Sequence, residues 1–176
     1  MTKYIGFLAA FALGVTLAGL ASASPQKDSY ALRARLAPRF EVPRPTGVPA
    51  RATGLFTGIA VELANDKARL SWRLSFSKLS GRALAAHIHK GRTGKSGPVL
   101  VALCGPCRNG QRGSATMTHA QLRVIERGVT YVNVHTPKNG AGEIRGQVRV
   151  SASDASGDSS SSTSTTTETP PYPSYP

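Results

Sequence analysis

Leu70-Ser-Trp-Arg-Leu-Ser-Phe76 alternates strictly between apolar and polar side chains. Successive side chains of an extended chain point to opposite sides, so the four apolar residues of this stretch share one face. A period of two predicts a strand with one face buried and the other in water. This stretch therefore indicates a β protein, and the segments around it extend the pattern.

Further strands are predicted between residues 49 and 150, where short loops containing Gly, Asn or Asp separate alternating or apolar segments. The predicted strands are residues 56–63, 84–89, 99–103, 129–136 and 143–150. One short helix is expected from the capping box of Thr118 and Gln121, with Leu122 and Ile125 on its apolar face. The region predicts an all-β fold, a Greek-key β-sandwich or barrel of about seven to eight strands with disordered ends.

Both ends of the 176-residue chain differ in composition from this β domain, residues 49–150. Residues 1–23 predict a signal peptide, because a basic start and an apolar run precede a small-residue cleavage site. Residues 24–48 are rich in Pro, Ala and Arg and predict a basic linker. Residues 151–176 are rich in Ser, Thr and Pro and predict a disordered tail, glycosylated or crossing a cell wall. We expect a protein that is secreted, extracellular or in the cell envelope, the periplasm included, and free of the membrane after signal removal.

The chain is strongly basic, with 22 Lys and Arg against 9 Asp and Glu, a net charge of +13. Lys90, Arg92 and Lys95 crowd a glycine-containing loop and are the candidate anion-binding residues. Such a field attracts an anionic glycan or cell-envelope polymer, although a basic surface also serves solubility alone. The remaining candidate partner is an extracellular protein. Nucleic acid is not an expected partner, because no aromatic side chains lie among the basic residues on which nucleotide bases could stack.

Three histidines lie on two of the predicted strands. His87 and His89 are two residues apart and share a face, and His135 lies on the polar face of another strand. Three imidazole nitrogens suit copper or zinc, so these residues are the candidate metal ligands. The alternative is structural, with each histidine bonded to a carboxylate or a backbone carbonyl and fixing the strand register.

A polar network is expected beside these histidines. Its candidate members are Asn133, Glu143, Arg145 and Gln147, which occupy the polar faces of their strands. Glu143 is also a candidate fourth metal ligand. In the structural alternative, Glu143 accepts a hydrogen bond from a histidine, and Arg145 pairs with Glu143 or Gln147.

Cys104-Gly-Pro-Cys107 has the spacing of a thioredoxin active site. It follows a predicted strand, however, and no helical pattern comes after it. In an exported protein this spacing favours a small disulfide loop between Cys104 and Cys107. The chain also lacks a recognisable nucleophile elbow, a carboxylate pair and a phosphate-binding loop, so it is not expected to be an enzyme.

Two motifs resemble a known family. AHIHKGRTGKSGPVLVAL and, further on, GVTYVNVHTPKNGAGEIRGQVRV are similar to the CHRD domain, first described in chordin and found in many bacterial secreted proteins. The resemblance covers about residues 50–150, with Gly140-Ala141 where the family often has Pro-Gly. It implies an extracellular β domain of poorly defined activity. Chordin's growth-factor binding is associated with cysteine-rich modules that this chain lacks, so that function is not carried over.

The Ala-His-Ile-His strand is also similar to the copper-ligand strand of copper/zinc superoxide dismutase. The bridging histidine, the zinc loop and the guiding arginine of that enzyme have no counterpart in this sequence, so dismutase activity is not expected. The sequence therefore favours a non-enzymatic extracellular binding or structural module, for an anionic envelope polymer or a protein partner. The alternative is a copper- or zinc-binding protein with a dismutase-like histidine cluster.

Overall fold

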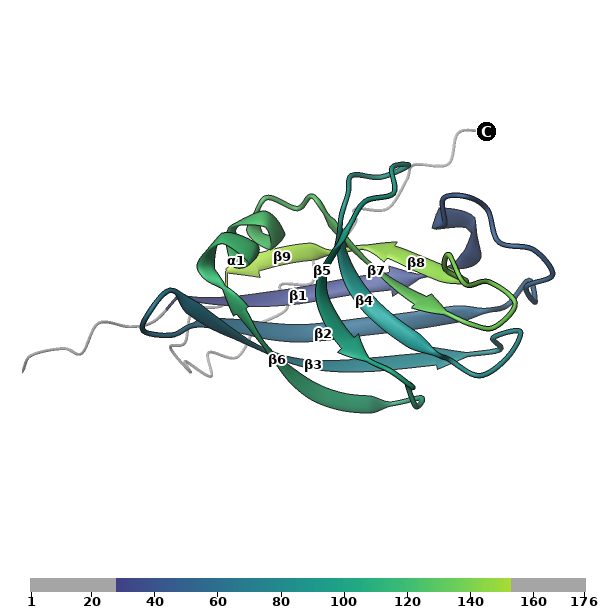
Figure 1. Ribbon diagram of the computed structural model, residues 1–176, viewed down its shortest axis with the longest axis horizontal. Coiled ribbons are helices and arrows are strands. Elements are labelled where there is room, and N and C mark those ends of the chain that lie inside the picture. The colour runs from purple at the N-terminus through teal and green to yellow at the C-terminus, as the bar shows by residue number, and fades with distance from the viewer. Residues whose placement is uncertain (1–27, 153–176) are drawn as a thin grey trace, which may run out of the picture.

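Two antiparallel sheets make up the fold in the computed structural model, which describes residues 28–152 (Figure 1). The strands are β1 (Ser29–Leu36), β2 (Thr53–Glu62), β3 (Lys67–Ser77), β4 (Ala85–Lys90), β5 (Val99–Cys104), β6 (Gln111–Thr118), β7 (Thr130–His135), β8 (Ile144–Gln147) and β9 (Arg149–Ala152). The five-stranded sheet has the order β6-β3-β2-β1-β9, and the four-stranded sheet has the order β5-β4-β7-β8. The predicted all-β class is confirmed, as a sandwich of two sheets.

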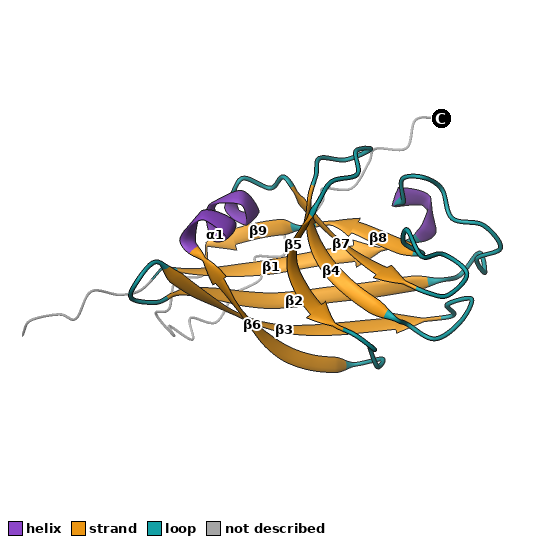
Figure 2. Cartoon of the chain, in the orientation of Figure 1, coloured by secondary structure: helices purple, strands orange, loops and turns teal. Residues whose placement is uncertain are grey.

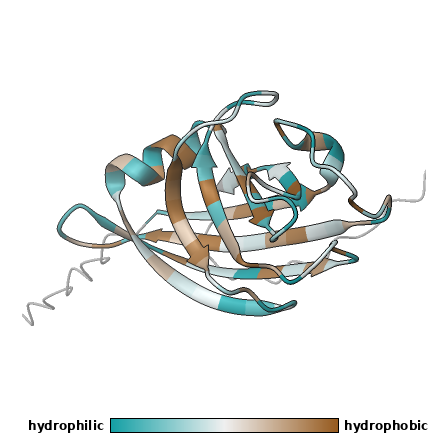
Figure 3. Ribbon diagram, turned by 45° about the vertical axis from the view of Figure 1, so that its right-hand side comes forward, coloured by the Kyte–Doolittle hydropathy of each residue, from teal (hydrophilic) through white to brown (hydrophobic). Residues whose placement is uncertain are grey.

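The core lies between the sheets and follows the alternation of the strands (Figure 3). The five-stranded sheet contributes Phe56, Leu70 and Leu74, none of which is exposed. From the four-stranded sheet come Ile88 and Val132, which are equally buried. Each strand thus gives its apolar face to the core and leaves its polar face on the outside of the sandwich.

The short helix is as the sequence predicts. Helix α1 spans His119–Glu126, and both hydrogen bonds of the Thr118–Gln121 capping box are present. Leu122 and Ile125 are fully buried. A single 3-10 turn, η1 (Pro38–Phe40), lies at the opposite end of the sandwich (Figure 2).

The linker prediction for residues 24–48 is wrong where the structure describes it. Ser29–Leu36 is strand β1, paired with β2 on one side and β9 on the other. Leu32, Ala34 and Leu36 face the core, and the arginines between them face outward. Small alanines and frequent arginines hid this alternation in a segment that reads as a basic linker.

Two more strands differ from the predictions. β6 was not predicted, because its core-facing side begins with Gln111, Gly113 and Ala115 and carries one large apolar residue, Met117. At Gly113 a Cβ atom would clash with the indole of Trp72. The predicted strand 143–150 is divided at Val148, so that β8 belongs to one sheet and β9 to the other. The result is nine strands between residues 28 and 152. Residues 1–23, and residues 153–176 of the predicted tail, lie outside the described part of the chain.

Candidate metal centre

Three histidines meet on the outer face of the four-stranded sheet. β4 and β7 pair antiparallel, with Ala85 opposite His135 and His87 opposite Asn133. His87 and His89 alternate with the buried Ile88, so their side chains point away from the core. The pairing therefore brings His135 next to His87, although 48 residues separate them in the chain.

The three imidazoles are close enough to share one ion. One ring nitrogen of each of His87, His89 and His135 lies within 4.8 Å of the others. The shortest approach, 3.0 Å, joins Nδ1 of His87 to Nε2 of His135. The centroid of the His87 ring lies 5.0 Å from that of His135 and 5.6 Å from that of His89.

Two backbone carbonyls determine which nitrogen of each ring carries its proton. Nδ1 of His89 lies 2.9 Å from the carbonyl oxygen of Gly97, and Nδ1 of His135 lies 2.9 Å from that of Gly140. A carbonyl oxygen only accepts, so both Nδ1 atoms donate and, in the neutral rings, both Nε2 atoms keep a free lone pair. Nε2 of His135 accepts from His87. Nε2 of His89 is buried and has no hydrogen-bond partner within the described residues.

The environment keeps two of the rings neutral. Burial, followed by the neighbouring His135 and His89, lowers the pKa of His87 below its ordinary value. Burial also lowers the pKa of His135, against the opposing effect of its hydrogen bond to Gly140. Neutral imidazole is the form that binds a metal, so His87 and His135 are available for binding at neutral pH.

A stack of side chains supports His89 on this face. The His89 ring lies parallel to Tyr131, with centroids 5.0 Å apart and an interplanar angle of 7°. The Arg145 guanidinium carbon lies 3.3 Å from the centre of the Tyr131 ring, a cation–π contact. Arg145 also donates through Nη2 to the carbonyls of Arg92, at 3.0 Å, and Lys95, at 2.8 Å.

Arg145 and Gln147 therefore hold the loop that carries Gly97. Gln147 donates to the Gly91 carbonyl at 2.8 Å, which fixes the start of this loop. At Gly97 itself a Cβ would clash with the Lys90 carbonyl, so only glycine permits this approach. The candidate anion-binding side chains Lys90, Arg92 and Lys95 are exposed, while their loop orients the ring of His89 through its backbone.

Glu143 is not part of the histidine cluster, which corrects the prediction of a fourth ligand. Its buried carboxylate accepts hydrogen bonds from the Ser80 backbone at 2.5 Å, Thr136 Oγ1 at 2.6 Å and Asn139 Nδ2 at 3.1 Å, and from the Ser80 hydroxyl. Burial raises the pKa of Glu143, but these hydrogen bonds outweigh it and leave the pKa below its ordinary value. Arg145 does not pair with Glu143 either.

The hydrogen bonds around Glu143 hold the turn that orients His135. Asn139 and Thr136 belong to the turn that leads to Gly140, whose carbonyl binds His135. Asn133 donates to the Ala141 carbonyl of the same turn at 3.4 Å. Two polar networks thus orient His89 and His135, one through each loop, and both act through backbone carbonyls. The sequence analysis assigned no role to Gly97, Gly140 or Tyr131. The glycines beside each histidine strand were the available signal.

The other cysteine and histidine motifs lie elsewhere. Cys104 and Cys107 form a disulfide with Cα atoms 5.2 Å apart, at the end of β5. This bond closes a small loop and leaves no free cysteine in the described region. His119, at the start of α1, lies 3.8 Å from Asp66 and takes no part in the cluster.

The chain matches the family model of the CHRD domain over residues 32–148. That is more than half of its length, and the chain belongs to this family, whose domains are extracellular-type modules. A search of curated proteins and of solved structures finds no match to the chain. None of the helices between residues 28 and 152 has the length and hydrophobicity that crossing a bilayer requires.

Proposed function

We propose that this chain is a non-enzymatic extracellular metal-binding module, which takes one copper or zinc ion at His87, His89 and His135. The observation that carries the proposal is Nε2 of His89, a buried nitrogen that no protein group within the described residues satisfies. A buried acceptor without a partner costs about 1–3 kcal/mol. An ion bound at this nitrogen would remove that penalty.

The donor set fits these two metals. Three neutral imidazoles with an open further position are typical of zinc and copper sites, whereas magnesium and calcium prefer oxygen ligands. Carbonyls that accept from the opposite ring nitrogen are the usual outer-shell partners of metal-binding histidines, and His89 and His135 each have one. His87 would bind through Nδ1 after its proton moves to Nε2.

The competing interpretation is a purely structural histidine cluster. It explains the His87–His135 hydrogen bond and both carbonyl contacts, but it gives Nε2 of His89 no role. In a structural cluster, a protein donor is expected at this nitrogen, because the large majority of buried polar atoms in proteins have a hydrogen-bond partner. This difference makes metal binding the better account of the face.

Export is part of the proposal. The apolar start and the Ala21-Ser-Ala23 site support removal of a signal peptide, and the disulfide between Cys104 and Cys107 suits an oxidising compartment. We place the mature protein outside the cytoplasm, in the periplasm, at the cell surface or beyond it. Sequencing of the protein recovered from an exporting host should begin at Ser24.

The decisive experiment is the elemental metal content of the exported chain, purified without an affinity tag or chelator. We expect close to one copper or zinc per chain in the wild type and less than a tenth of that in His87→Gln. His119→Gln is the matched control and should retain the wild-type content, because His119 lies outside the cluster. A wild-type chain that holds neither metal after dialysis against both would overturn the proposal, as would full occupancy in folded His87→Gln.

A further inference from the structure

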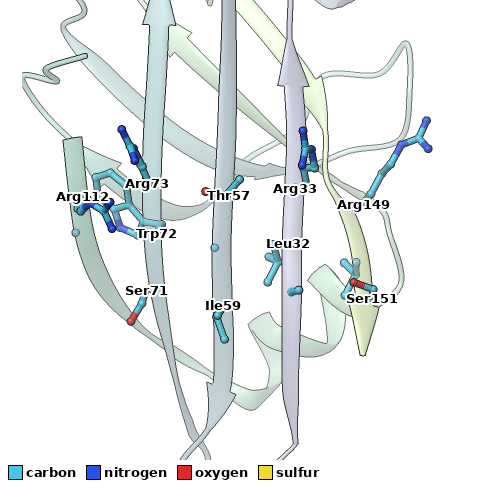
Figure 4. Close-up of a pocket in the computed structure, with 14 residues that line it drawn as sticks. Leu32, Arg33, Thr57, Ile59, Ser71, Trp72, Arg73, Arg112, Arg149 and Ser151 are labelled. Atoms are coloured by element: carbon cyan, nitrogen blue, oxygen red, sulfur yellow. The ribbon is translucent and has the colours of Figure 1, made fainter. Parts of the chain in front are cut away.

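The outer face of the five-stranded sheet carries one straight row of arginines. Arg112 of β6 pairs with Arg73 of β3, and Arg73 pairs with Thr57 of β2. Thr57 pairs with Arg33 of β1, which in turn pairs with Arg149 of β9. Figure 4 shows these five side chains in line across all five strands. We call them the arginine row.

Between residues 28 and 152, no acidic side chain pairs with the arginine row. All four arginines are exposed, and none of them makes an ion pair or a side-chain hydrogen bond to another described residue. Like charges placed directly opposite each other destabilise a sheet, and the row contains two such pairs, Arg73–Arg112 and Arg33–Arg149. With strands about 4.8 Å apart, the row extends for roughly 19 Å. An arrangement with this energetic penalty, repeated across the whole sheet, points to an anionic partner.

Hydroxyl groups and a shallow hollow adjoin the row. The hollow has a volume of about 750 Å³ and is lined by the four arginines together with Thr57, Ser71 and Ser151. Trp72 is the one aromatic residue among its lining residues, and only 5% of it is exposed. The face therefore offers hydrogen bonds and charge, without rings on which nucleic-acid bases could stack.

One end of the row continues into a second, deeper hollow. Arg33 and Arg149 also line a cleft of about 870 Å³, which Arg35, Arg39 and Arg145 share with one acid, the buried Glu41, and one exposed ring, Phe40. Arg145 is only 1% exposed, and its Nη1 has no hydrogen-bond partner within the described residues. A buried guanidinium nitrogen without a partner at the wall of a basic cleft is suited to one anionic group of a ligand.

We propose that the arginine row and this cleft bind a linear anionic polysaccharide, carrying sulfate or carboxylate groups. The chain of sugars would lie across the five strands, with one anionic group in the cleft against Arg145. Arginine forks bind sulfate and carboxylate in pairs of hydrogen bonds, and the neighbouring hydroxyls match those of sugars. The site meets the histidine face only at Arg145, which lines the cleft and also stacks on Tyr131. Polysaccharide binding should not require the metal.

Binding of size-defined heparin fragments to the full chain, measured by calorimetry at fixed salt, tests this proposal. The variant Arg33→Gln/Arg73→Gln/Arg112→Gln should bind at least tenfold more weakly, a loss of about 1.4 kcal/mol. The matched control is Lys90→Gln/Arg92→Gln/Lys95→Gln, which removes the same charge from the exposed loop. We expect this control to stay within threefold of the wild type.

Several outcomes would overturn the proposal. Equal losses in the two triple variants would mean that net charge alone attracts the polymer. An absence of heparin binding by the wild type, or tighter binding of a DNA duplex at the same salt concentration, would exclude the polysaccharide site. If Arg33→Gln/Arg73→Gln/Arg112→Gln shows no thermal unfolding transition, the single variants Arg73→Gln and Lys90→Gln replace the two triple variants. Only Arg73→Gln should then weaken heparin binding.

Discussion

The outer faces of the two sheets follow the same alternation of side chains but differ in burial. On the four-stranded sheet, loops cover the polar side chains, and Asn133 and Arg145 are at most 2% exposed. On the five-stranded sheet, the arginine row lies open to solvent. Burying a polar group costs free energy unless it is hydrogen-bonded, whereas exposed charges are screened by water and salt. One face therefore became a cross-linked polar layer around three histidines, and the other remained a field of unpaired charge.

This difference in burial indicates that polar groups contribute to stability on the covered face of the four-stranded sheet and not on the open face of the five-stranded sheet. Removing a hydrogen-bonding group from the covered face leaves partners unsatisfied in a water-poor environment. Removing an arginine from the open face takes away repulsion and leaves nothing unsatisfied. The same kind of substitution should therefore have opposite signs on the two sheets.

The largest effect is expected at Glu143. Glu143→Ala removes the acceptor for Ser80, Thr136 and Asn139 and should lower the free energy of unfolding by about 3 kcal/mol or more. Urea unfolding followed by Trp72 fluorescence measures it. Arg149→Ala, on the open face, is the control and should change stability by less than about 0.5 kcal/mol. A Glu143→Ala loss below 1 kcal/mol would show that the covered network is not a source of stability.

A smaller effect is expected from acid, in the metal-free chain. The pKa values of His87 and His135 are lowered in the folded state, so below about pH 6.5 the unfolded chain takes up protons first. Stability should therefore fall as the pH decreases from about 6.5 toward the folded-state pKa values, by at most about 1.4 kcal/mol per pH unit for each histidine. Thermal melts between pH 7.5 and 5.5 should show a smaller acid loss in His87→Gln/His135→Gln than in the wild type.

Glu41 opposes the loss of stability that the two histidines cause as the pH decreases. Burial raises the pKa of Glu41 to about 8, against the opposing field of Arg145. This carboxyl therefore adds stability as the pH falls from 8 to its unfolded value, and it does so equally in both proteins. The difference between the two melts isolates the histidines. Parallel pH profiles in wild type and double variant would show that the histidines titrate alike in the folded and unfolded chain.

The smallest effect, of opposite sign, is expected on the open face. Arg73→Gln/Arg112→Gln removes one directly opposed pair of like charges and should raise the free energy of unfolding by about 0.5 kcal/mol. Added salt should stabilise the wild type more than this variant, because salt screens the remaining repulsion. Urea midpoints at low and high salt provide the measurement. A variant less stable than the wild type would mean that these arginines support the sheet through packing.

Local pattern was enough for most of the fold. The alternation in Leu70–Phe76 placed a strand and its buried face correctly, and the capping box of Thr118 located helix α1. The side of the strand that His87, His89 and His135 occupy also followed from the sequence. These features depend on the period of the backbone and on neighbours within about four residues. A single sequence carries such information directly.

Pairing between distant segments decided the rest. The sequence of β1 resembles a linker, and its identity as a strand depends on pairing with β2 and β9. Glu143 accepts hydrogen bonds from Ser80 and from a nearby turn, and the sequence indicated neither partner. The arginine row exists only through the register of five strands, since Arg33 and Arg149 come from opposite ends of the domain sequence. Register and loop coverage arise from contacts between residues far apart in the chain. Alternation therefore determined which side chains face outward, and only the tertiary structure decided which outward face is buried around histidines and which is left open to solvent.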